Sequence, residues 1–254
     1  MKLNDFTDMM EKIAPRELAL DFDNPGLLIG TNRTEIKKVL VALDLTVETA
    51  KEAIDFGADL VLTHHPIFFA PVKSICPKRP DTAAAYMLIQ AGIAHFAAHT
   101  NLDIAQGGVN DALAESLGLL NIVPLPPENL GRVGTLKTPM TLEEFARFVQ
   151  EKLDTKVRIC GESDSTISRV AVIGGSGGSE CDTVHAFGAD VLVTGEIKHS
   201  QALSARCTGL NIVEAGHYET ERVVLMPLIK HLQTISNDIQ YKLTLSERTS
   251  LRGV

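Results

Sequence analysis

Residues 56–66 read FGADLVLTHHP, and residues 187–199 read FGADVLVTGEIKH. Both stretches place the same tetrapeptide before a short apolar run, which is typical of a buried strand that ends in a polar turn. Only the first turn contains two adjacent histidines, His64 and His65. The repeat therefore indicates how the chain is built, and the difference between its two copies indicates where the chain's chemistry lies.

The repeat extends beyond the tetrapeptide. KVLVALD at 38–44 aligns without a gap onto RVAVIGG at 169–175, at the offset of 131 residues that also separates the two FGAD sequences. A second pair, AHTNLD and AGHYETE, shares the pattern His-x3-acid at an offset of 118 residues. Two ungapped matches in the same order predict a duplicated unit, whose halves we expect to pack around an approximate two-fold axis.

Predicted strands alternate with predicted helices along most of the chain. One helix begins after Thr46, a residue suited to the N-cap, and ends at Gly57. This alternation predicts an α/β fold of two related halves, in which mostly parallel sheets are flanked by helices. The Pro-rich region at about 121–131 is the predicted linker between a first half at 1–125 and a second half at 126–254, with no large inserted domain.

The composition disfavours several classes of protein. The 254 residues are 44% hydrophobic and 22% charged, as in an ordinary globular protein. A net charge of −8 argues against a nucleic-acid-binding face, which needs clustered Lys and Arg. The sequence has no apolar run of the roughly 20 residues that cross a bilayer, no signal-peptide core at its N-terminus, and no CxxC pair among its four cysteines. These features predict a soluble cytoplasmic protein with no membrane partner.

Histidines and acids gather at the ends of the predicted strands, where ligands bind in parallel α/β sheets. The predicted metal ligands are His64, His65, Asp103, His217 and Glu221. Imidazoles and carboxylates without thiolate suit Zn²⁺, Mn²⁺, Fe²⁺, Co²⁺ or Ni²⁺. Because this set exceeds what one catalytic ion takes from a protein, we expect two divalent ions per chain, about 3.5–4 Å apart and bridged by Glu221, between the halves. The alternative is that the adjacent histidines are structural and that His217 and Glu221 form a surface pair on a helix.

The second copy carries other polar residues where the first has its histidine pair. Glu196 and His199 follow the second strand, and we expect them to act as general acid–base groups or to orient metal ligands. Asp44 ends the strand in ALDLT and either contacts a helix N-terminus or orients a ligand. We expect His95, in the apolar run IAHFAA, to lie in the core, and GGSGG at 174–178 to form either a tight turn or a phosphate cradle.

Several motifs together resemble a known family. In chain order they are FDNPGLLIG, ALDLT, FGADLVLTHHPIFF, AHTNLD, GADVLVTGEIKH and EAGHYETE. They resemble the GTP cyclohydrolase 1 type 2 homologues, also called Nif-three-like dinuclear metal-centre proteins. The resemblance implies a two-metal site at the five ligands named above and a ring-shaped homohexamer whose metal sites face an interior cavity. Two positions depart from the family pattern, since Phe22 stands where Trp is common and Ser200 where a second His is common.

The resemblance implies a metal-dependent hydrolase that acts on a nucleotide or a similar phosphorylated small molecule, and the family name implies ring opening of GTP. Water activated by the ions would attack the substrate, and Glu196, His199 or His99 would transfer protons. The alternative is a non-catalytic metal-binding protein that serves as a metal chaperone, a regulator or an oligomeric scaffold. Nucleic-acid binding is a third function, which the acidic balance disfavours.

Overall fold

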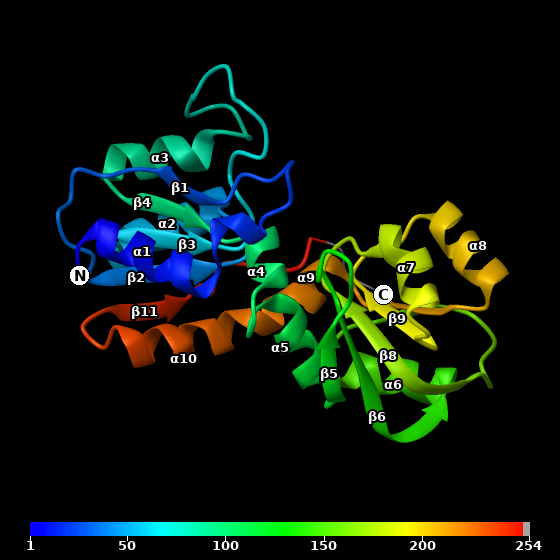
Figure 1. Ribbon diagram of the computed structural model, residues 1–254. Helices are drawn as coiled ribbons and strands as arrows, with labels where there is room; N and C mark the ends of the chain where they lie inside the picture. The colour runs from blue at the N-terminus through cyan, green and yellow to red at the C-terminus, as the bar shows by residue number, and fades with distance from the viewer. Residues whose placement is uncertain (251–254) are drawn as a thin grey trace. The chain divides into compact units, whose positions relative to one another are not determined.

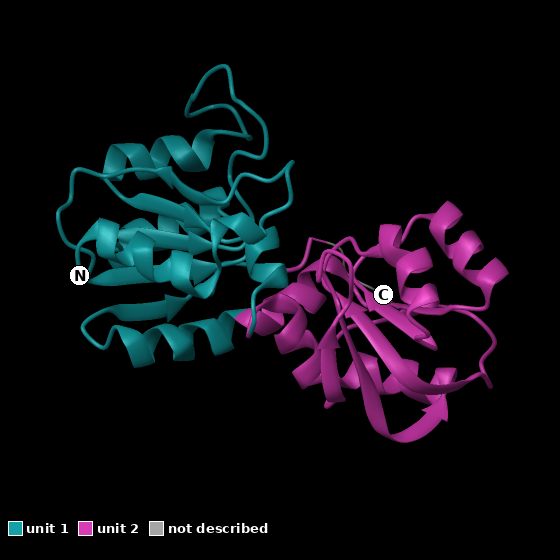
Figure 2. Ribbon diagram, in the orientation of Figure 1, with its two compact units in different colours: residues 1–106, 225–248 teal, residues 107–224, 249–254 magenta. Residues whose placement is uncertain are grey.

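The computed structural model describes residues 1–250, which form two compact units (Figures 1 and 2). Unit 1 is built from Met1–Gln106 and Leu225–Arg248, and unit 2 is built around Gly107–Val224. Each unit has its own sheet and its own core, so the predicted two-half α/β fold is confirmed. Between residues 1 and 250, no helix is long and apolar enough to cross a lipid bilayer.

The sheet of unit 1 has the order β1-β4-β3-β2-β11. Its strands are β1 (Gly26–Ile29), β2 (Lys38–Ala42), β3 (Leu60–Thr63), β4 (Ala94–Ala97) and β11 (Gln240–Leu243). All of these strands run parallel except β1, which pairs antiparallel with β4 at one edge. Every residue of β3 and β4 is buried, as expected for parallel strands that are covered on both faces.

Helices cover both faces of this sheet (Figure 1). They are α1 (Leu3–Ile13), the short 3₁₀ helix η1 (Arg16–Leu18), α2 (Val47–Phe56), α3 (Ala83–Ala91), α4 (Thr100–Ile104) and α10 (Leu225–Ile235). Helices α2 and α3 pack over Leu40 and Val61, whereas Phe6 of α1 packs edge-on against Phe96, which lies on the opposite face. The caps predicted for α2 are present, because the Thr46 hydroxyl accepts the N–H of Thr49 and the helix ends at Gly57.

The sheet of unit 2 has the order β5-β6-β8-β9-β10-β7. Its strands are β5 (Leu120–Pro124), β6 (Arg132–Thr141), β7 (Arg158–Cys160), β8 (Thr166–Ile173), β9 (Val191–Thr194) and β10 (Asn211–Glu214). Strands β8, β9 and β10 are parallel to one another, whereas β5, β6 and β7 pair antiparallel. This sheet is therefore more mixed than the sequence predicted.

Alternate residues of the central strands in unit 2 supply two different cores, because successive side chains of a strand point to opposite faces. The helices are α5 (Val109–Ser116), α6 (Leu142–Leu153), α7 (Cys181–Ala186), α8 (His199–Thr208) and α9 (His217–Glu221), with 3₁₀ turns at Gly178–Glu180 and Arg222–Val224. Val170 and Val172 pack with Phe145 of α6. Ala171 packs with Val184 of α7 on the other face.

The strand pairing supports the predicted duplication. In unit 1, Val39 of β2 lies opposite Leu60 of β3. In unit 2, Val170 of β8 lies opposite Val191 of β9, and the next pairs follow in the same register. Both members of each pair are related by the offset of 131 residues, so the two copies share their backbone arrangement.

The repeated FGAD sequence has the same structural role in each copy. Its glycine, Gly57 or Gly188, has a positive φ of 68° or 79° in the turn after a helix. Its aspartate accepts backbone hydrogen bonds from two consecutive residues in or next to the neighbouring strand. Asp59 accepts the N–H groups of residues 37 and 38, and Asp190 those of residues 168 and 169. The tetrapeptide therefore ends a helix and ties the next strand to its neighbour.

The division of the chain differs from the expected boundary at 121–131. That region holds β5 and the turn into β6, and these two strands pair with each other within unit 2. The first segment of unit 1 instead ends at Gln106, and unit 2 begins at Gly107. The segment Leu225–Arg248 returns to unit 1, because β11 pairs in parallel with β2.

Candidate metal centre

Three histidines of unit 1 form a cluster at the ends of neighbouring strands. His64 and His65 directly follow β3, and His99 follows β4. Their ring centroids are 4.9 Å apart for His64 and His65, 5.1 Å for His64 and His99, and 5.5 Å for His65 and His99. One nitrogen from each ring lies within 4.8 Å of the others, so the cluster could bind a metal ion.

The first two imidazoles are oriented by acceptors at Nδ1. His64 Nδ1 lies 2.8 Å from the carbonyl oxygen of Ala98, and His65 Nδ1 lies 2.9 Å from Oδ1 of Asp44. An acceptor at Nδ1 favours the tautomer that carries its proton there and its lone pair on Nε2. Metal-ligating histidines commonly have this arrangement. Of the two roles predicted for Asp44, the structure supports the orientation of a ligand.

His99 is held in the same way by Asp23, a residue to which the sequence assigned no role. His99 Nδ1 lies 2.7 Å from Oδ1 of Asp23, and the backbone N–H of Thr100 donates to Oδ2 of the same carboxylate at 3.0 Å. Burial raises the pKa of Asp23, but the hydrogen bonds from His99 and Thr100 outweigh it and lower this pKa to about 2. Asp23 is therefore a carboxylate that supports His99. Its signal in the sequence was its place in the quoted motif FDNPGLLIG.

Asp103 adds a carboxylate to the histidine cluster. It lies in α4, one turn after His99, and only 9% of its surface is exposed. Its Oδ1 is 3.6 Å from Nε2 of His64. The predicted ligands of unit 1 are thus brought together, and His99, predicted only to transfer protons, lies among them.

Unit 2 brings together its two predicted ligands. His217 and Glu221 are the first and last residues of α9, and Nε2 of His217 lies 3.1 Å from Oε1 of Glu221. The other nitrogen of His217, Nδ1, lies 3.1 Å from Oε1 of Glu196. Glu196 therefore orients this imidazole as Asp44 orients His65. The Glu221 side chain is 5% exposed, so it is not one of a pair of surface residues.

The glycine loop at 174–178 makes room for this pair. Gly175 has a φ of 61°, and a Cβ atom there would lie 2.2 Å from Oε1 of Glu221 and 3.1 Å from Nε2 of His217. The Gly175 carbonyl also accepts the N–H of Glu196 at 2.9 Å. The loop is therefore a tight turn, as one of the two interpretations predicted, and it packs closely against the carboxylate of α9.

The remaining histidines of interest have different surroundings. His199 is exposed at the first residue of α8. His95 is fully buried, its Nε2 lies 2.7 Å from the hydroxyl of Thr63, and burial lowers its pKa to about 3. His95 is therefore a neutral core residue, as predicted.

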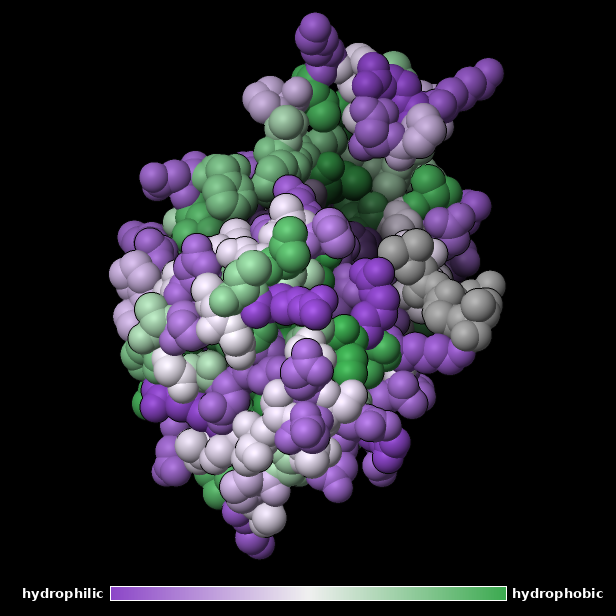
Figure 3. All heavy atoms as spheres, turned by 90° about the vertical axis from the view of Figure 1, so that its right-hand side faces the viewer, coloured by the Kyte–Doolittle hydropathy of each residue, from purple (hydrophilic) through white to green (hydrophobic). Residues whose placement is uncertain are grey.

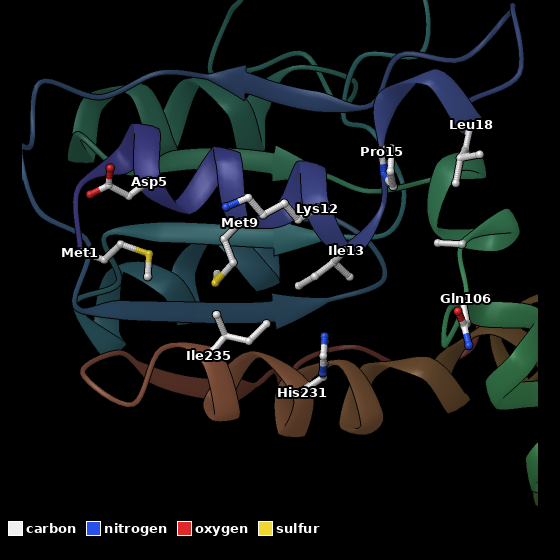
Figure 4. Close-up of a pocket in the computed structure, with 11 residues that line it drawn as sticks. Met1, Asp5, Met9, Lys12, Ile13, Pro15, Leu18, Gln106, His231 and Ile235 are labelled. Carbon is white, nitrogen blue, oxygen red and sulfur yellow. The ribbon is translucent and has the colours of Figure 1, made fainter.

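A separate cavity of about 710 Å³ lies in unit 1 between α1 and α10 (Figure 4). Its wall is partly apolar, with Met9 and Ile13 of α1 facing Ile235 of α10, and it also includes Lys12 and His231. None of the histidines and acids described above lines it. This cavity and the candidate metal ligands are therefore distinct features of unit 1.

Comparison with known proteins supports the resemblance noted in the sequence. The family model described as Duf34/NIF3 (NGG1p interacting factor 3) matches residues 1–250. The chain belongs to the Duf34/NIF3 family. Over 249 residues it is 34% identical to a GTP cyclohydrolase 1 type 2 homolog of Clostridium perfringens, with 95% of each protein covered.

Solved structures of Duf34/NIF3 relatives agree with the fold. A hypothetical protein of Staphylococcus aureus, 32% identical, superposes with a TM-score of 0.93 over 100% of this chain and 99% of the other. A Bacillus cereus protein related to NIF3, 26% identical, gives the same TM-score with the same coverage. The architecture described above is thus shared across these proteins.

Proposed function

We propose that this Duf34/NIF3 protein is a hydrolase that depends on two divalent metal ions and acts on a nucleotide or another phosphorylated small molecule. One observation carries the proposal. Three imidazoles, those of His64, His65 and His217, each have Nδ1 within hydrogen-bonding distance of an oxygen acceptor. Each is thereby prepared to offer Nε2 to a metal ion. The name of the Clostridium perfringens relative favours a nucleotide substrate.

The donor chemistry fits divalent transition metals. We propose as ligands His64, His65 and Asp103 of unit 1 and His217 and Glu221 of unit 2. When bound, the ions would supply Lewis-acid activation of water and of the substrate. Asp44 and Glu196 would hold the Nδ1 protons of their histidines, and Gly175 would leave space for the Glu221 carboxylate.

The proton-transfer groups are a further part of the proposal. His99 lies beside the unit 1 ligands and would transfer a proton at its Nε2, while Asp23 holds its Nδ1. His199, exposed at the first residue of α8, and Glu196, exposed in the segment before it, are the other candidates for proton transfer. The contact of Glu196 with His217 favours orientation of that ligand over direct proton transfer.

Elemental mass spectrometry on protein purified without a histidine tag tests the metal centre. We expect about two ions per chain in the parent protein. A sharp loss is expected in both Glu221→Ala and His64→Ala, because each removes a ligand. His185→Ala, which changes an exposed histidine of α7, is the matched control and should keep its metal. A parent protein that takes up no Mn²⁺, Fe²⁺ or Zn²⁺ would contradict the proposal.

Turnover separates a hydrolase from a metal carrier or scaffold. Metal-loaded protein is incubated with GTP and with other nucleotides, and the products are resolved by chromatography. A hydrolase consumes at least one nucleotide at a rate that falls in His99→Gln. A carrier passes its metal to an acceptor chelator and consumes none.

We also propose that the protein assembles as a cytoplasmic homohexamer. The family resemblance supports the assembly, and the four free thiols, Cys76, Cys160, Cys181 and Cys207, suit a reducing compartment. Light scattering coupled to size-exclusion chromatography should give about six times the chain mass of 27.5 kDa. A monomer mass at micromolar concentration would contradict the assembly.

A further inference from the structure

Two phenylalanine rings lie exposed next to each other in unit 1. Phe22 is 61% exposed and Phe69 is 54% exposed. Their ring centroids are 5.9 Å apart, with an angle of 47° between the rings. Large aromatic side chains are normally buried, as Phe6 and Phe96 are here, so a paired exposure calls for an explanation.

The backbone on each side of these rings is anchored. Phe22 precedes Asp23, whose carboxylate is held by His99 and Thr100. Phe69 follows Phe68, whose carbonyl oxygen accepts a hydrogen bond from the Asn24 side chain at 2.6 Å. The Phe68 side chain also packs against the core under α2 and α3. The two rings are therefore presented to solvent by fixed backbone, so little conformational entropy remains to be lost when a ligand binds them.

The pair is continuous with the histidine cluster. The Phe69 ring lies 6.1 Å from the His99 ring, edge to face at 82°, and His99 in turn lies 5.1 Å from His64. Phe69 belongs to the connection between β3 and α3, which forms the loop at the top of Figure 1, and Figure 3 shows apolar side chains gathered below the polar tip of this loop. A ring bound on the phenylalanines would thus lie beside the candidate ligands.

We infer that Phe22 and Phe69 form a platform on which a planar heteroaromatic ring of the substrate, such as a purine base, stacks next to His99. Every base offers a π face to an aromatic side chain, and such stacking is strong without hydrogen-bond readout. The role of the platform in catalysis rests on the proposed function, whereas its binding of a ring does not. The platform acts as a positioning device, because it would fix the ring while the rest of the substrate reaches the ions.

The chain contains no tryptophan, which provides a clean test. Phe22→Trp keeps an aromatic ring and introduces a single fluorophore into the full-length, Zn²⁺-loaded protein. We expect GMP to quench its emission saturably, and ribose 5-phosphate, which lacks the base, to leave it unchanged. Adding Phe69→Ala should weaken GMP binding about tenfold. Adding Leu203→Ala, a change in α8 at the same exposure of 54%, should leave GMP binding unaltered.

Three results would overturn the platform, in addition to an absence of quenching in metal-loaded protein. They are equal binding of GMP and ribose 5-phosphate, unaltered GMP binding after Phe69→Ala, and a change of assembly mass in Phe22→Ala/Phe69→Ala, which would make the pair a contact between subunits. Metal content is measured on the same samples. Quenching by GMP in protein that binds no metal would support the platform and contradict the proposed hydrolase. An absence of quenching in metal-loaded protein would contradict the platform alone.

Discussion

The two copies of the FGAD unit have the same strand register but different residues at the strand ends. At the offset of 131 residues, Asp44 corresponds to Gly175 and His65 to Glu196. In the first copy Asp44 orients the imidazole of His65. In the second copy Glu196 stands where His65 would be and orients His217. The duplicated backbone therefore fixes where polar groups gather, and single side chains decide which group is a candidate ligand and which group orients it.

The largest effect is expected at Gly175 of the second copy, where the absence of a side chain leaves room for the Glu221 carboxylate. Gly175→Ala would place Cβ 2.2 Å from Oε1 of Glu221 on a backbone with φ of 61°. We expect the free energy of unfolding to fall by about 3 kcal/mol. Metal affinity should fall as well, because Glu221 must move. Urea unfolding and calorimetric Zn²⁺ titration measure the two effects.

Gly188→Ala is the matched control for this substitution. Gly188 has a φ of 79°, and a Cβ there meets no described atom within 4 Å. Because only backbone strain is added, Gly188→Ala should lower the free energy of unfolding by about 1 kcal/mol and leave metal affinity unchanged. Equal effects of the two alanines on metal binding would refute the close packing of Gly175 against α9 as the cause.

The second prediction tests whether Asp44 and Glu196 are equivalent supports. Asp44→Asn and Glu196→Gln each keep the size of the side chain and remove the charge that holds a histidine Nδ1 proton. We expect each to lower metal affinity by about 10–100-fold. If Glu196→Gln instead abolishes turnover and leaves metal affinity intact, Glu196 is a proton-transfer group and the proposed equivalence is wrong.

The third prediction concerns the part of the repeat that is unchanged between copies. Asp59→Asn and Asp190→Asn each weaken two hydrogen bonds from backbone N–H groups to a carboxylate. We expect each to lower the free energy of unfolding by about 2 kcal/mol, with no effect on metal affinity. Denaturant titration of both variants checks this, and a large effect in only one copy would show that the tetrapeptide is not equivalent in the two units.

The smallest effect is expected at a contact that only the first copy has. Glu52, whose counterpart is Thr183, accepts hydrogen bonds from the Thr244 hydroxyl and the Leu245 and Ser246 N–H groups. Burial raises the pKa of Glu52, but its hydrogen bonds, led by that of Thr244, lower it to about 2. Because the folded pKa lies below the ordinary 4.5, Glu52 stabilises the protein above that pH and loses this effect as the pH falls towards 2.

Glu52→Gln should therefore lower the free energy of unfolding by about 1–2 kcal/mol at pH 7. The difference between parent and variant should shrink when urea midpoints are compared at pH 7, 4 and 3. A difference that stays constant over this range would show that the Glu52 charge does not stabilise the segment after β11.

Most of the local structure could be predicted because its signals are local. The FGAD repeat combines a helix-ending glycine with a strand-tying aspartate, so β2, β3, β8 and β9 could be paired from the sequence. The predicted ligands of unit 1 meet because they follow the adjoining strands β3 and β4, and those of unit 2 meet because they lie one turn apart on α9. Asp23 was missed because its contact with His99 spans 76 residues and nothing in either segment encodes it.

Two further features could not be predicted from local sequence patterns: the boundary between the units and the return of residues 225–248 to unit 1. The turn between β5 and β6 is rich in proline, and proline-rich segments are typical both of linkers and of hairpin connections. The return of 225–248 to unit 1 depends on β11, a strand of only four residues whose partner β2 lies near the other end of the chain. Such pairing is set by tertiary packing rather than by the strand's own residues.

That return has a consequence for how the protein is made. Synthesis proceeds from the N-terminus, so the ribosome completes Gly107–Val224 of unit 2 before β11 emerges. Until then the open edge of β2 is available for wrong partners, such as the same strand of another nascent chain. Newly made protein therefore depends on β11 to cover the edge of β2, and synthesis that stops before β11 would release an aggregation-prone product.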